Sequence, residues 1–386
     1  MKIDIRLLGL VFAVSQNALA MDWTGNFSSV NYLQYYSNPL FLSNPQGVSV
    51  ADWTPGYAVT GQNDLYTVKA QGSVNLLKSS NPGLMVNRAD PTAVIFAGYN
   101  GATSRLNLTL NYSQVTTLPM GISPIQSGQY SNATVDATRI SRSAAMEWQK
   151  DFNERYSLDT TATLSAVDFS QPGSVQNTYS LFPLMSYTEE QLSSKLSRQI
   201  LPTLTSYVLA NGGEMKPSSG TGQNSWYGVN LGSKWNISDA WLIDAYAGLS
   251  KVDNNVPGLT YISTGSQTGF SGSVDAEWAR DNDSFSLIAR QVFQGSAYGG
   301  ITESDVLSSA FVKQLSDRNF GGADLLYSKT LTIYLARQTM IDAWVSHHIS
   351  NGFDLKLMLQ RIQWMPSGLG ALTNNVMGLY LTYSDQ

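Results

Sequence analysis

Polar and apolar residues alternate along most of this chain. In the stretch SRLNLTLNYS, residues 104–113, a polar or charged residue occupies every second position, and the same period recurs at 65–77, 225–236, 270–278 and 353–360. Successive side chains of a β-strand point to opposite faces of its sheet. The two-residue period therefore predicts strands with one apolar and one polar face.

The connections between these segments alternate in length. Tight turns fall at residues 61–64, 100–101, 150–154, 201–202, 238–239, 281–283, 316–318 and 350–352. Between them lie mostly longer segments rich in Gly, Pro and Ser, at residues 38–47, 79–90, 119–132, 171–176, 212–222, 253–265 and 367–370. A hairpin sheet of this kind has one rim of short turns and one rim of long loops, which is typical of an outer-membrane barrel.

The pattern predicts eighteen strands, the first near Phe27 and the last near Tyr383. Sixteen is the alternative count, because the alternation is weakest at Ser180–Gln199 and Gly321–Gln338. An even number of strands places both termini at the short-turn rim. The predicted fold class is all-β, a single transmembrane antiparallel β-barrel.

Composition favours this barrel over a soluble protein. Of 386 residues only 13% are charged, whereas Tyr is present 20 times, Trp 9 times and Gly 32 times. Few ions and many amphipathic aromatics suit a surface that faces lipid. The net charge of −5, without a basic run, argues against a nucleic-acid partner. The absence of Cys excludes a disulfide scaffold, thiolate metal sites and cysteine nucleophiles.

The first twenty residues have the features of a secretory signal. Lys2 and Arg6 precede an apolar run at 7–14, and Ala18-Leu19-Ala20 forms a small-x-small cleavage site. The alternative is a membrane anchor, but spanning a bilayer takes about 20 apolar residues. We therefore expect a signal peptide at 1–20 and one barrel domain at 21–386.

The apolar stripe of each strand is expected to face lipid and the polar stripe a lumen, because hydrocarbon satisfies no unpaired strand edge. The alternative is a secreted soluble sandwich with the apolar stripes in its core. An interfacial aromatic girdle is predicted beside the short turns. Its members are Trp148, Tyr156, Trp235, Trp241, Trp278 and Phe353.

The same parity assigns a set of side chains to the lumen. The basic members are Lys69, Arg105, Arg139, Lys195, Lys234, Arg290 and Lys356. The acidic members are Glu147, Asp159, Asp244, Asp275, Glu277, Asp324 and Asp354, and the aromatic members are Tyr246 and Trp344. These charges either set up a transverse field across a wet pore or pair across the lumen and keep it polar. Arg142 and Arg198 fall on the lipid face by parity, which predicts a position near a rim or at a bulge.

The N-terminal part resembles a known group of proteins. Ser37–Ser43 (SNPLFLS), followed by Asp52–Gly56 (DWTPG) and a hairpin, is similar to the opening of outer-membrane barrels found with bacterial exopolysaccharide export systems, including the PEP-CTERM-associated type. In that group a TPG sequence starts a strand. The chain departs from the group by ending in Tyr383-Ser384-Asp385-Gln386 instead of an aromatic residue. The resemblance implies a role in polysaccharide export and brings no catalytic residues.

Candidate chemistry is sparse. The two histidines, His347 and His348, are adjacent and therefore point to opposite faces of a strand, beside a short turn. A hydrolase acting on external substrates needs its base near the long loops, so we expect no enzymatic activity. The sequence predicts no metal site and no cofactor, because Asp253 and Asp281 are isolated carboxylates.

These observations predict a channel in the bacterial outer membrane, surrounded by lipid and lipopolysaccharide. The preferred hypothesis is export or passage of exopolysaccharide together with periplasmic export proteins. The first alternative is a general or moderately selective porin for small polar solutes. The second is a structural barrel closed by its loops, with Pro119–Asn132 as the plug.

Overall fold

The computed structural model describes residues 21–39, 44–117, 137–170, 185–218, 222–255, 265–295, 300–331, 336–350, 352–366 and 370–385. The expected signal peptide at 1–20 and the expected plug at Pro119–Asn132 lie outside these ranges, as does the loop expected at 171–176. Within the described part of the chain, no helix is both long and apolar enough to cross a membrane.

Eighteen β-strands make up the fold, as the alternation predicts. They are β1 (Asp22–Tyr36), β2 (Val48–Gln62), β3 (Tyr66–Ser79), β4 (Arg88–Asn100), β5 (Ser104–Thr117), β6 (Ala137–Asn153), β7 (Tyr156–Ser170), β8 (Tyr187–Leu201), β9 (Leu204–Pro217), β10 (Asn224–Ser238), β11 (Trp241–Asn254), β12 (Gly265–Arg280), β13 (Asp283–Gly295), β14 (Ile301–Ser316), β15 (Asn319–Leu331), β16 (Ala336–Ser350), β17 (Phe353–Pro366) and β18 (Leu372–Ser384).

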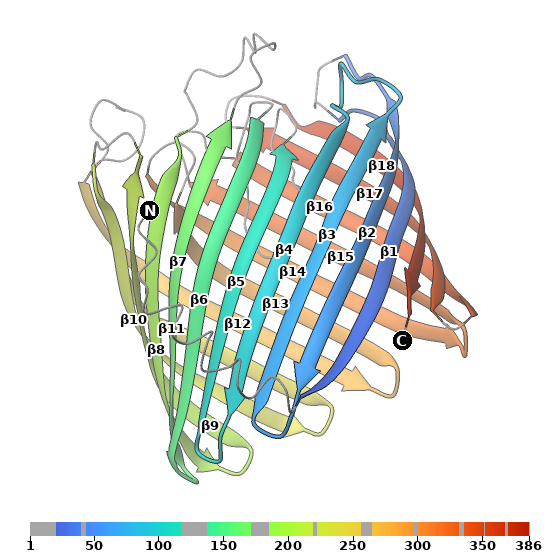
Figure 1. Cartoon of the computed structure of the whole chain (residues 1–386). Helices are drawn as coiled ribbons and strands as arrows, with labels where there is room; N and C mark the ends of the chain where they lie inside the picture. Colours follow the sequence, from blue (N-terminus) through green and yellow to red (C-terminus); the bar gives the residue numbers. More distant parts are fainter. Residues whose placement is uncertain are drawn as a thin grey trace.

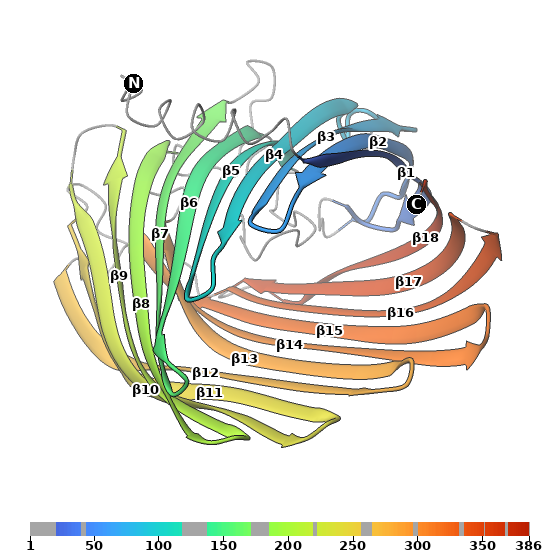
Figure 2. The same cartoon turned by 60° about the horizontal axis from the view of Figure 1, so that its bottom comes forward.

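The strands form one closed antiparallel barrel (Figures 1 and 2). Each strand pairs with its neighbours in sequence, and β1 also pairs with β18. At the closure, Tyr32 of β1 lies opposite Asp52 of β2 on one side and Tyr380 of β18 on the other. The predicted fold class and the count of eighteen are therefore confirmed.

The strand ends differ from the prediction where composition is ambiguous. β1 begins at Asp22 and not near Phe27. The weak segment 321–338 contains the end of β15 and the start of β16. β9 continues to Pro217 through residues expected in a loop. Its Gly213 is required in the strand, because a Cβ there would lie 2.8 Å from Nε1 of Trp226.

The sequence Thr54-Pro55-Gly56 does not start a strand, contrary to the expectation from the resemblance, and lies inside β2. β2 pairs with β1 through this stretch without a break. The pairing with β3 is interrupted at Thr54 and Pro55, between Trp53 and Gly56. Proline has no N–H to donate to a ladder, which accounts for a gap at this position.

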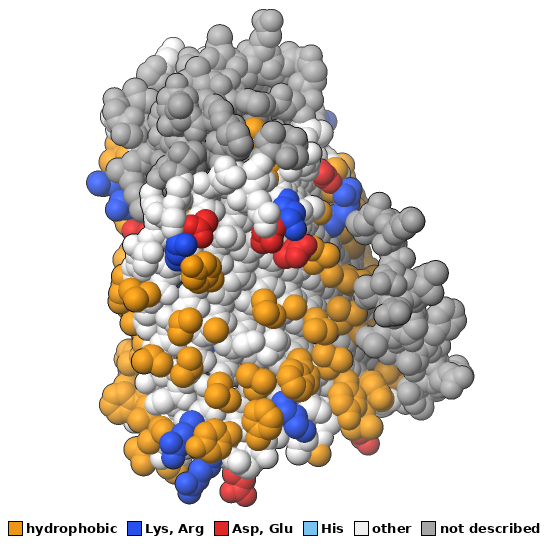
Figure 3. Space-filling model, turned by 90° about the vertical axis from the view of Figure 1, so that its left-hand side faces the viewer, with side chains coloured by type: hydrophobic (Ala, Val, Ile, Leu, Met, Phe, Trp, Pro, Cys, Tyr) orange, Lys and Arg blue, Asp and Glu red, His pale blue; other side chains and the backbone are white. Residues whose placement is uncertain are grey.

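The outer face of the barrel is an apolar belt (Figure 3). Its most exposed side chains include Leu231 at 68%, Phe270 at 67% and Leu249 at 64%. Charged side chains lie above and below the belt in this view. Aromatic residues border it beside the short turns, where the rings of Trp241 and Trp278 are 6.5 Å apart. An outer face of this kind fits a hydrocarbon layer about 25 Å thick.

Arg142 and Arg198 lie on this outer face, each near a rim. Arg142 is close to the long-loop end of β6, where its Nη1 is 2.8 Å from Oδ2 of Asp168. Arg198 is close to the short turn after β8, with its guanidinium 5.6 Å from the ring centroid of Tyr156. The apparent parity violations are thus ions beside the belt, where water and headgroups solvate them.

A charge placed in the middle of the belt tests which face meets lipid. We predict that Leu231→Arg lowers the free energy of unfolding in lipid vesicles by about 2–4 kcal/mol, the cost of a midplane cation on a barrel exterior. Leu209→Arg, on the opposite face of neighbouring β9, is the matched control and should cost much less. Denaturant unfolding followed by heat-modifiable gel mobility measures both. Equal losses would contradict the assignment of the faces.

Candidate functional site

The inner wall of the barrel is the candidate functional site. The strand registers place all sixteen residues assigned to the lumen by parity on one face of the sheet. They lie on β3 (Lys69), β5 (Arg105), β6 (Arg139, Glu147), β7 (Asp159), β8 (Lys195), β10 (Lys234), β11 (Asp244, Tyr246), β12 (Asp275, Glu277), β13 (Arg290), β15 (Asp324), β16 (Trp344) and β17 (Asp354, Lys356).

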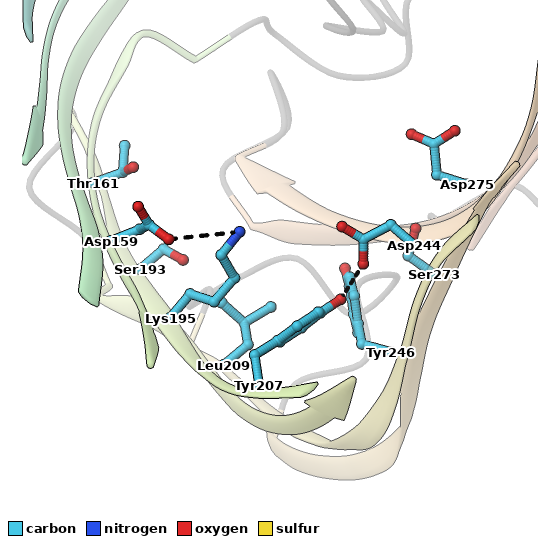
Figure 4. A pocket seen from close by; sticks show the side chains of 10 residues that line it. All are labelled: Asp159, Thr161, Ser193, Lys195, Tyr207, Leu209, Asp244, Tyr246, Ser273 and Asp275. Carbon is cyan, nitrogen blue, oxygen red and sulfur yellow. Dashed lines mark hydrogen bonds and ion pairs between the residues drawn. The ribbon is translucent and has the colours of Figure 1, made fainter. Parts of the chain in front are cut away.

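Five strands form a pocket of ≈ 340 Å³ in this wall (Figure 4). On one side, Nζ of Lys195 on β8 lies 3.7 Å from Oδ2 of Asp159 on β7. On the other side, Asp244 of β11 lies opposite Asp275 of β12 in the register. The complete lining is Asp159, Thr161, Ser193, Lys195, Tyr207, Leu209, Asp244, Tyr246, Ser273 and Asp275. The pocket thus carries three carboxylates and one ammonium group.

Tyr207 joins the two sides of this pocket, and the sequence analysis missed it. Its hydroxyl donates a hydrogen bond to Oδ1 of Asp244, two strands away from β9. The ring crosses β10 at Gly232, where a Cβ would lie only 2.4 Å from ring atoms. The missing side chain at Gly232 therefore leaves the space through which the phenol reaches the carboxylate. The alternation in β9 and an inward glycine on the next strand are the signals that could have identified it.

A second hydrogen bond that crosses a strand at an inward glycine lies two residues further along β10, toward the long loops. Oδ1 of Asn230 on β10 accepts a 2.7 Å hydrogen bond from Oγ of Ser271 on β12. The intervening strand β11 contributes Gly248, where a Cβ would lie 2.6 Å from Oδ1 of Asn230. Both side chains are buried in the wall. Inward glycines thus allow polar groups to bond across a strand and to line the lumen as a rigid layer.

A second polar group lies on β15–β17. Asp324 and Asp342 are opposite each other in the register. Nε1 of Trp344 donates to Oδ2 of Asp324 at 3.1 Å, and Nε2 of Gln360 donates to Oδ2 of Asp342 at 3.3 Å. Nζ of Lys356 lies 4.3 Å from the centroid of the Trp344 ring. This indole face is engaged by a cation, so it is not free to stack on a sugar ring.

A third cluster of polar side chains lies on β1, β2 and β3, next to the place where β1 pairs with β18. Oδ2 of Asp52 accepts from the hydroxyl of Tyr32 at 2.6 Å, and both its oxygens accept from Nδ2 of Asn75 at 2.7 Å. Oγ1 of Thr54 donates to Oδ1 of the same carboxylate at 3.0 Å. Asp52 was not among the sequence candidates, although its parity places it on the inner face. A carboxylate with this many donors is held fixed.

Several predicted lumen charges are not brought together. Among the described residues, Lys69, Arg105, Lys234 and Arg290 form no ion pair within 4.0 Å. Lys234 instead lies opposite Asp244, which in turn lies opposite Asp275, so one cation and two carboxylates follow each other along one row of the wall. The charges do not segregate into one basic and one acidic half of the barrel.

Apolar side chains form clusters on the inner wall near the long-loop end, which the alternation did not predict. Val167, Tyr187, Met215, Trp226 and Ile301 form one buried cluster there. Two further clusters lie elsewhere on the wall. One is on β2, β3 and the segment after β3 (Val48, Val50, Leu77 and Met85), and the other is on β17 and β18 (Ile362 and Val376). Buried polar side chains lie beside these clusters, such as Asp90 on β4 and Glu189 on β8, so this end of the wall is mixed.

The end of the β13–β14 hairpin lies inside the barrel and packs on the first of these clusters. The hydroxyl of Tyr187 on β8 donates to the carbonyl of Gly295 at 3.2 Å. Nδ2 of Asn254 on β11 donates to the carbonyl of Ile301 at 3.1 Å. The rings of Trp226 and Phe293 stack with centroids 5.9 Å apart. Among the described residues this element folds inward and narrows the lumen, whereas the expected plug at Pro119–Asn132 lies outside them.

The two histidines lie beside the short turn, as predicted. Nδ1 of His347 is 2.8 Å from Oδ1 of Asn319, and Nδ1 of His348 is 2.9 Å from Oδ1 of Asp354. Each imidazole is thus engaged by a neighbouring strand. In the described part of the chain, no group of three or more His, Asp or Glu side chains has the geometry to hold a metal ion.

No family model matches this chain, and no curated protein matches its sequence. Among solved structures it is similar to OccAB4 of Acinetobacter baumannii, with 10% identity over 94% of this chain and 98% of the other and a TM-score of 0.47. It is also similar to OpdK of Pseudomonas aeruginosa with vanillate, with 11% identity over 94% of this chain and 98% of the other and a TM-score of 0.49. The outer membrane channel DcaP of A. baumannii is similar as well, with 10% identity over 95% of this chain and 97% of the other and a TM-score of 0.48. Similarities of this size say nothing about the solute of this barrel.

The contact between Tyr207 and Asp244 is open to a direct test. We predict that Tyr207→Phe, which removes the donor, and Gly232→Ala, which displaces the ring, both increase the preference of the channel for cations. The physical reason is that Asp244 loses a hydrogen bond and presents its charge to the lumen. Reversal potentials across a KCl gradient in planar bilayers measure the effect. Gly269→Ala is the control, because nothing lies within 4 Å of a Cβ there; a shift in the control alone would contradict the prediction.

Proposed function

We propose that this protein is an outer-membrane channel that passes small polar solutes and prefers cations. The observation that carries this proposal is the pocket in the inner wall, with Asp159, Asp244 and Asp275 set against Lys195. Charged side chains lining a pore set the sign of the ions that enter it. An excess of carboxylates attracts cations and the ammonium groups of organic solutes.

The location in a bacterial outer membrane rests on the barrel surface. A closed sheet leaves few backbone groups unpaired, and the apolar belt faces outward on all the strands around Leu231 and Leu249. Strand-built proteins that span a bilayer are closed barrels with this belt and with aromatic girdles. Lipid and lipopolysaccharide are the partners that such a surface requires.

The size of the solute follows from the narrowing near the long loops. Eighteen strands enclose an aqueous channel unless an element folds inward. Here the β13–β14 hairpin does so, with Gly295 held by Tyr187 on β8. Nearer the short turns, the wall carries the pocket of ≈ 340 Å³, which has the scale of a small organic molecule.

Export of exopolysaccharide is the second candidate, and it rests on the resemblance of the N-terminal segments. A polysaccharide conduit requires aromatic faces free to stack on sugar rings. Trp344 is covered by Lys356, and Tyr207 is turned toward Asp244. These contacts favour small solutes over a polymer. A transport role, and not catalysis, also fits the two histidines, which are engaged at the short-turn end.

The charge of the pocket provides the test of selectivity. We predict that Asp244→Asn combined with Asp275→Asn lowers the ratio of cation to anion permeability, because two of the three carboxylates lose their charge. Reversal potentials in planar bilayers measure this ratio. Asp168→Asn on the outer face, paired with Arg142, is the matched control and should leave the ratio unchanged. The proposal would be refuted if the barrel showed no conductance, or if the pocket variants left the ratio of cation to anion permeability unchanged.

A deletion strain separates the two transport hypotheses. If the protein is a solute channel, the strain is expected to keep its surface polysaccharide and to take up small polar solutes more slowly. Complementation with the Asp244→Asn, Asp275→Asn variant should restore uptake of neutral solutes better than uptake of cations. Loss of surface polysaccharide with unchanged solute uptake would transfer the assignment to export.

A further inference from the structure

The pocket in the inner wall has a cation at one end and carboxylates at the other. Lys195 of β8 lies at one end, and Asp244 of β11 and Asp275 of β12 lie at the other. Figure 4 shows the ammonium group of Lys195 and the carboxylate of Asp244 directed toward each other from the two sides of the Tyr207 ring. A solute in this pocket therefore meets both signs of charge at once.

The ammonium group of Lys195 has hydrogen-bond donors to offer a solute. Its Nζ lies 3.7 Å from Oδ2 of Asp159, which makes an ion pair but exceeds the length of a hydrogen bond. It also lies 5.5 Å from the centroid of the Tyr207 ring. An ammonium group has three N–H donors, and this side chain is 38% exposed. The group can thus bind a carboxylate of a solute while Asp159 holds it in place.

The carboxylates at the other end have room for a cation. Asp244 and Asp275 are opposite each other in the register of β11 and β12, and like charges placed in this way repel. Oδ1 of Asp244 accepts from Tyr207, whereas Oδ1 of Asp275 has no hydrogen-bond partner among the described residues. Lys234 also lies opposite Asp244, but it is not part of the pocket lining. An ammonium group of a solute would relieve the repulsion between the two carboxylates.

The middle of the pocket is less polar than its ends. The ring of Tyr207 lies between the two ends, and Leu209 is beside it (Figure 4). The hydroxyl of Tyr207 is engaged by Asp244, so the ring presents its hydrocarbon part to the pocket. The other lining side chains carry hydroxyl groups and no charge; they are Thr161, Ser193, Tyr246 and Ser273. A short hydrocarbon segment of a solute fits this part of the pocket.

The position of the ring sets how far apart the charges of a solute must be. β8 and β11 are three strand spacings apart, which is about 14 Å at about 4.8 Å each. The side chains of Lys195 and Asp244 shorten this distance from both sides. In an α-amino acid both charged groups are attached to one carbon, so such a solute reaches only one end at a time. A dipeptide or an ω-amino acid carries its charges several bonds apart, and each extended residue adds about 3.3–3.6 Å.

From this geometry we propose that the pocket binds zwitterions whose ammonium and carboxylate groups are separated by several bonds. The carboxylate of the solute lies on Lys195, and its ammonium group lies between Asp244 and Asp275. This inference rests on the proposed function, because it names the class of solute for the same pocket. It adds a requirement that cation preference alone does not contain, since Lys195 takes part in binding.

Two isomers test the requirement for separated charges. Norvaline and δ-aminovalerate have the same atoms and the same charges, but only δ-aminovalerate carries the charges at opposite ends. The full mature chain is reconstituted in planar bilayers, and each compound is added while the KCl current is recorded. We expect δ-aminovalerate to block the current at a concentration about ten-fold lower than norvaline, pentylammonium or valerate. Only δ-aminovalerate contacts both ends of the pocket, and one more hydrogen bond to a charged group is worth about ten-fold in affinity.

Substitutions then assign the two ends. Lys195→Gln should raise the half-blocking concentration of δ-aminovalerate about ten-fold without weakening the block by pentylammonium, because Asp159 loses its counter-ion. Lys195→Arg keeps the charge and should retain the block. Asp275→Asn should weaken the block by both compounds. Lys216→Gln, on the outer face of β9 and paired with Glu214, is the matched control and should change neither. Heat-modifiable gel mobility shows that each variant is folded.

Failure of this inference is distinguishable from failure of the proposed function. A barrel that conducts and prefers cations, but that the two isomers block equally, would overturn the zwitterion assignment alone. The same holds if Lys195→Gln leaves the block by δ-aminovalerate unchanged, or if it weakens the block by pentylammonium to the same extent. A barrel without conductance would overturn the assignment together with the proposed function.

Discussion

Hydrogen bonding of the backbone in hydrocarbon is the constraint on which this structure depends. Neither lipid chains nor the apolar side chains of the belt can replace water as a partner for N–H and C=O groups. Closure of β1 on β18 removes the two edges that an open sheet would have. Everything on the inner wall is positioned by that closed ladder. Between β12 and β13 the described ladder ends at Ser273 and Arg290, beyond which the end of β13 packs against the inner wall.

Glycine has a particular use on the inner face. At most inward positions, the space over the strand is occupied by the side chain of that position. At Gly232 and Gly248 it is filled by a side chain from the neighbouring strand, which crosses over to a third strand. The polar layer that results, with Tyr207 on Asp244 and Asn230 on Ser271, links strands that are not direct neighbours in the backbone ladder. Such a layer fixes the orientation of the carboxylates that face the solute.

The fold was readable from the sequence because its determinants are local. A two-residue period and alternating turn lengths specify strand number and both rims without any long-range information. The face of each charged residue follows from the same parity. Contacts that depend on the third dimension were not readable: Tyr207 reaches Asp244 only because β10 carries a glycine between them. The inward β13–β14 hairpin was also missed, because Phe293 and Ile301 look like belt residues until the register shows that β13 leaves β12.

Closure of the barrel also has a consequence for biogenesis. The last rungs of the wall join residues near the beginning of the chain to residues near its end, such as Leu33 with Leu379. Contacts of such long sequence separation form late, because loop-closure entropy must be overcome first. Until β18 pairs with β1, every partly inserted chain has two unpaired strand edges that can pair with another chain. Truncation at the C-terminus therefore leaves an assembly intermediate and not a smaller pore.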